Sequence, residues 1–154
     1  MPRPASWRLS PTAYPHTQAV QTRFQDLDVL GHLNNVAFAA LFETARTKFN
    51  QQAQLWGLAG LRRRAVVAQM EINYVAEGQY PADVEIATGI GEIGGRSWQI
   101  LAAMFQDGKP LATCDVVIVM DKDEDGGGLS DAFKAELAKW LVTNPLPPAG
   151  EGQP

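Results

Sequence analysis

One short polar stretch holds most of the residues in this chain that are suited to acid–base or nucleophilic chemistry. It runs from Arg23 to Arg46 as RFQDLDVLGHLNNVAFAALFETAR, and its carboxylates, histidine and asparagines come immediately before an apolar helical pattern. A carboxylate can act as a nucleophile or a general base. Free N–H groups at the start of a helix can stabilise developing negative charge. This stretch is therefore the first candidate for a functional site.

The element that must position this cluster is a long helix, predicted from about Asn35 to Trp56. Asn34 or Asn35 suits its N-cap, and Gly57 suits its end. Its apolar residues recur at three- and four-residue steps, as expected for a helix with one buried side. These residues are Phe38, Leu41, Phe42, Ala45, Phe49 and Ala53.

Strands are predicted on both sides of this helix. The first spans Gln18–Phe24. The later four are Ala65–Glu77, Asp83–Ile93, Ser97–Gln106 and Leu111–Met120. Short connections favour antiparallel neighbours among the later four, and a final helix from Ser130 to about Val142 follows. The pattern predicts an α+β domain, in which a curved antiparallel sheet of five to six strands wraps around one long central helix.

The motifs of this chain resemble those of the 4-hydroxybenzoyl-CoA thioesterase-like branch of the hot-dog fold superfamily. The matching elements are Asp26-Leu27-Asp28, Gly31-His32-Leu33-Asn34-Asn35, Phe42-Glu43-Thr44-Ala45-Arg46 and the hairpin Ile93-Gly94-Gly95-Arg96-Ser97. The resemblance implies a hot-dog fold and hydrolysis of an acyl-CoA thioester.

The resemblance also implies the roles of individual residues. Asp28 corresponds to the family's catalytic carboxylate, acting as nucleophile or as general base on water. A backbone N–H near Asn35 would polarise the thioester carbonyl. The family further implies a homodimer or homotetramer, with facing helices and sites at the dimer interface.

Other polar residues of the stretch have structural interpretations beside the catalytic ones. His32 is suited to assist proton transfer or to orient Asp28, but equally to be a hydrogen-bonded turn residue. Asp26 is expected to stabilise the turn. Glu43 is a rival catalytic carboxylate, although an ion pair with Arg46 at i,i+3 is the favoured interpretation.

Arginines are the candidates for holding the phosphates of an acyl-CoA substrate. Arg62, Arg63 and Arg64 form the densest basic cluster, and Arg96 lies at a predicted hairpin tip. Arginine pairs well with phosphate. The alternative for the triple cluster is a solvated surface, which is the commoner role of such a run.

Composition limits the other possibilities. The chain has 154 residues and a net charge of −4, which suits one domain and argues against nucleic-acid or membrane partners. We expect an irregular segment at 1–16, the domain at 17–143 and a flexible tail at 144–154. One cysteine, Cys114, excludes an intrachain disulfide and a multi-cysteine zinc site and fits a reducing cytoplasm. No metal, cofactor, signal peptide or transmembrane segment is expected.

Three other functions remain open beside acyl-CoA hydrolysis. The thioester can be carried by an acidic acyl carrier protein, docked on a basic surface. A hot-dog dehydratase would need a histidine with an acidic partner, which the context of Asp28 disfavours. A non-catalytic acyl-CoA-binding module would keep the pocket and tolerate loss of Asp28.

Overall fold

The computed structural model describes residues 3–55, 65–120 and 127–144. Its helices are α1 (Asn35–Gln52) and α3 (Asp131–Ala138), and its strands are β1 (His16–Val20), β2 (Ala65–Tyr74), β3 (Val84–Ile93), β4 (Ser97–Gln106) and β5 (Lys109–Met120). Short 3-10 helices lie at Ser6–Leu9, Pro11–Ala13 and Phe24–Asp26. None of these helices combines the length and apolarity that spanning a bilayer requires.

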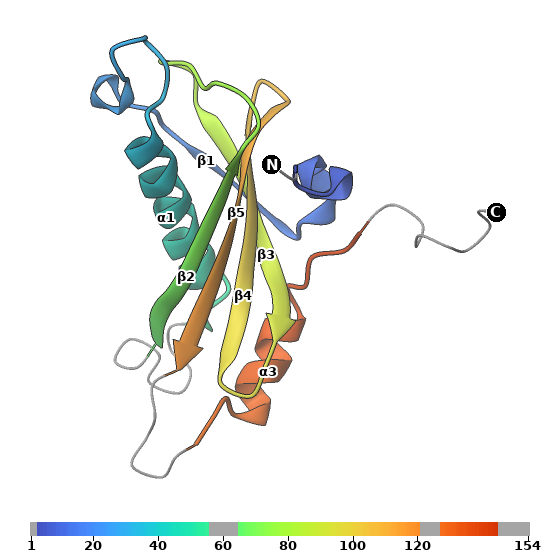
Figure 1. Cartoon of the computed structure of the whole chain (residues 1–154). Coiled ribbons are helices and arrows are strands. Elements are labelled where there is room, and N and C mark those ends of the chain that lie inside the picture. Colours follow the sequence, from blue (N-terminus) through green and yellow to red (C-terminus); the bar gives the residue numbers. More distant parts are fainter. Residues whose placement is uncertain (1–2, 56–64, 121–126, 145–154) are drawn as a thin grey trace, which may run out of the picture.

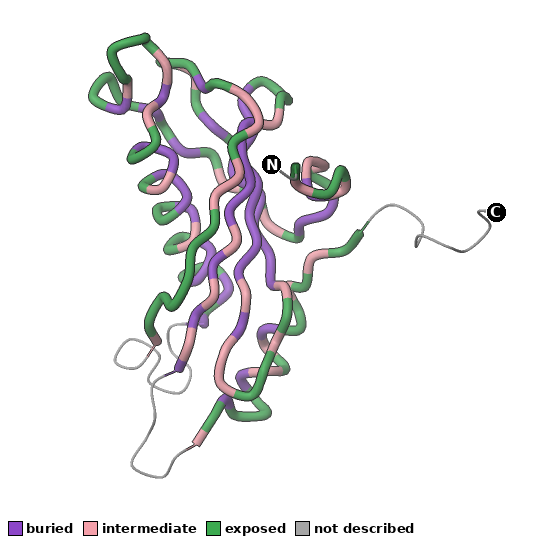
Figure 2. Tube along the Cα trace, viewed as in Figure 1, coloured by how far each residue is buried: buried purple, intermediate pink, exposed green. Residues whose placement is uncertain are grey.

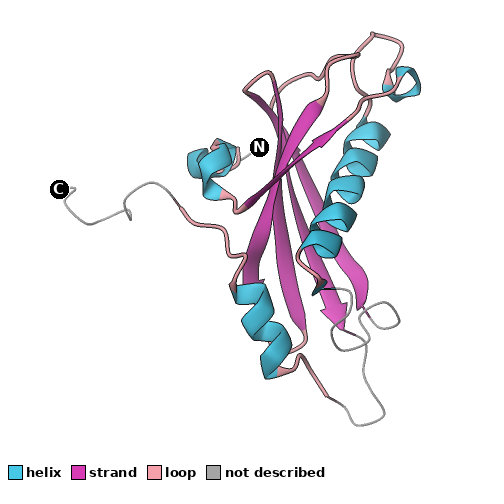
Figure 3. Ribbon diagram, turned by 180° about the vertical axis from the view of Figure 1, so that it is seen from behind, coloured by secondary structure: helices cyan, strands magenta, loops and turns pink. Residues whose placement is uncertain are grey.

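The described strands form one antiparallel sheet in the order β1-β3-β4-β5-β2, with α1 lying along one face (Figures 1 and 3). This confirms the predicted hot-dog architecture. One neighbour relation was wrong, because β2 pairs with β5 and not with β3. The connection at residues 75–83 instead crosses the β4–β5 hairpin, where the Gln106 side chain donates to the carbonyl oxygens of Gln79 and Ala82.

Helix α1 buries the side that its spacing predicted. Phe38, Phe42 and Phe49 are each at most 3% exposed and pack in one core with the sheet. Asn34 is the N-cap, and its Oδ1 accepts the N–H of Ala37 at 2.7 Å. The helix ends at Gln52, before the predicted Trp56, because Gln54 takes a left-handed conformation with φ of 57°. The proposed stop at Gly57 lies outside the described residues.

The first strand is shifted toward the N-terminus relative to the prediction. Phe24 was assigned to the strand, but it begins a 3-10 turn and its side chain is 74% exposed. The cause is Asp26, whose Oδ2 accepts the backbone N–H of Arg23 at 2.9 Å and closes the turn. The strand itself occupies His16–Val20.

Strand β2 forms an exposed edge of the sheet. Its pairing with β5 shifts between Val67 and Gln69, so the regular alternation of side chains between the two faces is interrupted at Ala68. Most of the strand is solvent-exposed, as the green tube of Figure 2 shows. The exposed apolar side chains are Val66, Val67, Met70 and Tyr74. A long apolar edge of this kind is a template for pairing with another chain.

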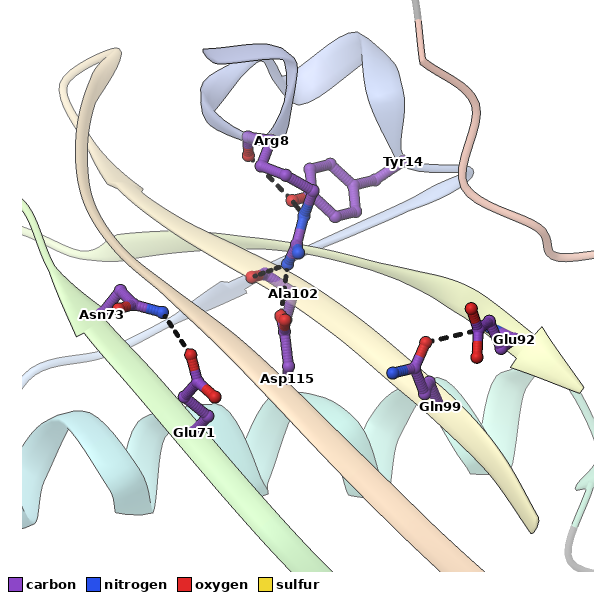
Figure 4. A network of polar contacts seen from close by, with 8 residues as sticks. All are labelled: Arg8, Tyr14, Glu71, Asn73, Glu92, Gln99, Ala102 and Asp115. Carbon is purple, nitrogen blue, oxygen red and sulfur yellow. Dashed lines mark hydrogen bonds and ion pairs between the residues drawn. The ribbon is translucent and has the colours of Figure 1, made fainter. Parts of the chain in front are cut away.

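Residues 6–14, here called the N-terminal strap, pack on the face of the sheet opposite α1. Tyr14 contacts a second apolar cluster that includes Leu101 and Phe105. Arg8 anchors the strap, because its guanidinium donates to Asp115 Oδ1 at 2.7 Å and to the Tyr14 hydroxyl at 2.9 Å (Figure 4). The proline-rich start of the chain therefore packs against the sheet without forming a strand or an α-helix in its described part.

The C-terminal helix is shorter than predicted. It ends at Ala138, and Leu141 forms a parallel bridge with Ile90 of β3. Val142 donates its N–H to Ile90 O, so the chain extends the β1 side of the sheet after α3 ends. Ser130 caps α3 as expected, accepting the N–H of Phe133.

Candidate functional site

A tight turn at residues 28–32 holds Asp28 in front of helix α1. The backbone N–H of Asp28 donates to His32 O at 2.8 Å, and Gly31 adopts a φ of 81°, which favours glycine. The Asp28 side chain takes part in the turn, since its Oδ1 accepts the N–H groups of Leu30 at 2.9 Å and His32 at 3.2 Å. Its Oδ2 accepts no hydrogen bond from the described residues, and the side chain is exposed.

Asp26 stabilises the segment on both sides of this turn through its side chain and its backbone carbonyl. It is 3% exposed and forms an ion pair with Arg23, with 2.9 Å between Oδ1 and Nη2. Its carbonyl oxygen also accepts the N–H of Asn34 at 2.8 Å. The two aspartates of the pair thus differ in role: Asp26 is buried and structural, as expected, while Asp28 faces solvent.

The start of α1 presents free backbone donors next to this turn. The Asn34 side chain satisfies Ala37 N–H, and the Asn34 carbonyl satisfies Phe38 N–H. The amides of Asn35 and Val36 have no partner among the described residues. Such groups, with the positive end of the helix dipole, form a site for negative charge.

Asp28 and these amides line one open cleft of about 440 Å³. Asn34, Asn35, Val36 and Arg23 also line it. The structure therefore brings Asp28 and Asn35 together. His32 is not part of the lining: its Nε2 lies 3.1 Å from Glu77 Oε2, while its backbone supports Asp28.

The other candidates lie elsewhere. Glu43 does not line this cleft, and it forms no ion pair with Arg46 in the described part of the chain, contrary to the favoured interpretation. Arg96 lies in the turn between β3 and β4, as predicted, and this turn is at the opposite end of the sheet from the start of α1 (Figure 1). The Arg96 guanidinium donates to Met120 O at 3.3 Å. Residues 62–64, the triple-arginine cluster, lie outside the described residues, so their contact with substrate stays a prediction.

Sequence reasoning missed exposed apolar side chains near the cleft: Val36 lines it, and Val29 and Leu30 lie in the turn that follows Asp28. Val29, Leu30 and Val36 are between 76% and 101% exposed. Large apolar side chains clustered at a polar cleft indicate a surface that a ligand or another protein covers. The sequence did contain a sign of this surface, because Val29 and Leu30 are apolar residues inside an otherwise polar turn.

Chemically, the cleft combines an available carboxylate oxygen with unpaired backbone donors. That combination can direct a nucleophile at a carbonyl carbon while stabilising the oxyanion that forms. Within the described ranges, no three His, Cys, Asp or Glu side chains gather closely enough to hold a metal ion.

Solved structures of similar fold include several thioesterases. A predicted thioesterase from Bacillus stearothermophilus is 29% identical, with a TM-score of 0.70 over 82% of this chain and 96% of that protein. A thioesterase from Thermus thermophilus, solved with coenzyme A and zinc, is 26% identical, with a TM-score of 0.71 over 82% and 95%. A gentisyl-coenzyme A thioesterase shares the fold at 14% identity, with a TM-score of 0.68 over 80% and 99%.

No protein of curated function matches the chain significantly. The sequence does match a thioesterase-like superfamily over residues 22–141, a span that contains the cleft, α1 and all strands except β1. The chain therefore belongs to the thioesterase-like superfamily.

Proposed function

We propose that this protein is an acyl-CoA thioesterase, hydrolysing an acyl-CoA thioester to a free acid and coenzyme A. The observation that carries the proposal is a cleft lined both by Asp28, whose Oδ2 accepts no hydrogen bond from the described residues, and by Asn35 and Val36, whose amides have no partner among them. The coenzyme A bound to the similar Thermus thermophilus thioesterase supports this substrate class.

In this mechanism the thioester carbonyl lies at the start of α1. The amide of Asn35 donates to the carbonyl oxygen and stabilises the negative charge of the tetrahedral intermediate, a contribution of about 3–4 kcal/mol per donor. Asp28 attacks the carbonyl carbon or removes a proton from the attacking water. The leaving thiol has a pKa of about 8.5, so it needs no strong acid.

His32 acts as a positioning residue. Its backbone N–H fixes Asp28 Oδ1, and its side chain ties the turn to Glu77, close to the point where β2 ends. The pair holds the turn against the sheet while Asp28 Oδ2 stays free.

The active unit is a homodimer, or a tetramer of two such dimers, paired through β2. The exposed apolar side chains of β2 and of the Val29-Leu30 turn are then covered by the partner. A two-fold, antiparallel pairing of β2 with its copy sets the start of one α1 beside the end of the other, and the cleft lies at the interface.

A second candidate is a non-catalytic acyl-CoA-binding module. The observation in its favour is that Asp28 Oδ1 already accepts two backbone N–H groups, as an aspartate with a purely structural role would.

The substitution Asp28→Asn separates the two candidates. An asparagine keeps the Oδ1 acceptor, so the turn is preserved, but it removes the nucleophilic or basic oxygen. We expect release of free thiol from short, long or aromatic acyl-CoA esters to fall by about 10²–10⁴-fold, with folding and oligomeric state unchanged. Asp107→Asn, in the β4–β5 turn, is the matched control and keeps full activity.

Unchanged turnover in Asp28→Asn would exclude the assigned role of Asp28. Binding of acyl-CoA by the wild type without any turnover would establish the binding module instead.

A further inference from the structure

A second cavity lies between α1 and the sheet, away from the Asp28 cleft. It measures about 150 Å³ and is bounded by the last turns of α1 and by β2, β4 and β5. A smaller space of about 10 Å³ adjoins the central strands, and Arg46 lines both. The Asp28 cleft and these two cavities share no lining residue.

Arg46 is a half-buried cation for which the described residues supply no counter-ion. It forms no hydrogen bond or ion pair with any residue in the described part of the chain, and Glu43, one turn before it, does not pair with it. Burial raises the pKa of the Cys114 thiol, and the positive charge of Arg46 partly opposes this effect. The charge of the Arg46 guanidinium is therefore felt by buried groups between α1 and the sheet.

Each cavity is also lined by a buried polar side chain that has no hydrogen-bond partner among the residues that the structure describes. Trp98 lines the larger cavity, is 2% exposed, and its Nε1 has no hydrogen bond. Thr88 lines the smaller one, is 1% exposed, and its Oγ1 is likewise unpaired. Unsatisfied buried groups are rare and costly, so their presence beside one unpaired arginine indicates a missing polar ligand.

The chemistry of the lining defines that ligand. A guanidinium and an indole N–H can only donate, so the ligand must supply an acceptor, and the cationic donor favours an anion. The side chains of Val66, Val67 and Ile118 provide an apolar wall for its carbon chain. A cavity of about 150 Å³ holds a molecule the size of a benzene ring, so the part of the ligand that it binds is small.

We propose that this cavity binds the distal carboxylate of a dicarboxylic acyl group, with Arg46 as its charge partner and Trp98 as an additional donor. The proposal rests on the proposed thioesterase function. Arg46 follows Asn35 by about 16 Å along the α1 axis. In the antiparallel dimer proposed above, the start of one α1 lies beside the end of the other, so an acyl chain held by Asn35 of one copy would extend toward the Arg46 cavity of the other. Glu43 also lines this cavity, but it is solvent-exposed, so its repulsion of a bound carboxylate is screened by water.

The kinetic test compares adipyl-CoA with hexanoyl-CoA, which match in chain length and differ in the terminal carboxylate. We expect the wild type to prefer adipyl-CoA, and Arg46→Met to lower kcat/KM for adipyl-CoA by about 100-fold while hexanoyl-CoA changes by less than about threefold. Arg46→Lys restores part of the preference. Lys48→Met removes an exposed charge from the same helix and leaves the preference intact.

Calorimetric binding of free adipate separates this inference from the proposed function. Adipate binding that disappears in Arg46→Met, with no turnover of either ester, supports the carboxylate site and contradicts the thioesterase. Turnover of hexanoyl-CoA without adipate binding, or an equal loss for both esters in Arg46→Met, supports the thioesterase and overturns the carboxylate site. Urea unfolding of each variant confirms that the fold is retained.

Discussion

Replacing Arg8 by methionine tests whether the N-terminal strap is anchored by charge. Methionine keeps an unbranched stem but removes the bonds to Asp115, to the Tyr14 hydroxyl and to Ala102 O. Breaking a fully buried ion pair costs about 3–5 kcal/mol, whereas an exposed pair contributes about 0–1 kcal/mol. The side chains of Arg8 and Asp115 are 10% and 33% exposed, so this pair lies between the two limits.

We therefore expect Arg8→Met to lower the free energy of unfolding by about 2 kcal/mol, and Tm by about 6 °C. Asp115 remains one-third exposed and can still be hydrated, which keeps the loss below the fully buried value. Lys139→Met is the matched control. It removes the exposed ion pair with Glu136 and should cost less than about 0.5 kcal/mol.

The assay is urea unfolding followed by tryptophan fluorescence, together with limited proteolysis of residues 6–14. A double-mutant cycle with Asp115→Asn should give a coupling energy of about 1–2 kcal/mol. If Arg8→Met unfolds at the wild-type urea concentration and its strap resists protease equally well, then the ion pair does not anchor the strap and the reasoning is refuted.

Three further predictions concern single residues. Burial lowers the pKa of His16, so the unfolded chain binds the proton more tightly than the folded one, and the free energy of unfolding should decrease as the pH is lowered below about 6.5. His16→Phe should flatten this pH dependence, measured by urea unfolding at several pH values. An unchanged pH dependence in the variant would contradict the prediction. Burial raises the pKa of Cys114 to about 12, so the native thiol should resist Ellman's reagent near neutral pH and react only after unfolding. Asn34→Ala removes the α1 cap and should cost about 1 kcal/mol of unfolding free energy, while Asn34→Ser should recover most of it.

Local patterns predicted the fold well where neighbouring residues determine the structure. The three- and four-residue spacing around Phe42 and Phe49 identified the buried side of α1, because one helix face meets the core. The Asn34 cap and the β4 bounds were also correct. Strand adjacency was less predictable, since the placement of β2 beside β5 depends on how residues 75–83 cross the β4–β5 hairpin.

The contacts of charged residues were the least predictable part of the structure. The spacing of Glu43 and Arg46 favoured an ion pair, but Arg46 instead lines the space between α1 and the sheet, because a long side chain can reach beneath its own helix. Arg8 was missed altogether, since its partner Asp115 is far away in sequence. In contrast, the polar turn around Asp28 was visible in the sequence because residues 28–32 bond mainly to one another.

The two edges of the sheet are unequal, and this inequality bears on the proposed pairing of two copies of the chain. The edge strand β1 has five residues available for pairing with another chain, and the edge strand β2 has ten. Pairing β2 with β2 uses the long edge of both copies, so the shared sheet ends after two copies. Pairing β2 with β1 would leave a long edge free on every new copy and could continue as a fibre. A short β1 therefore favours a closed assembly over a polymer.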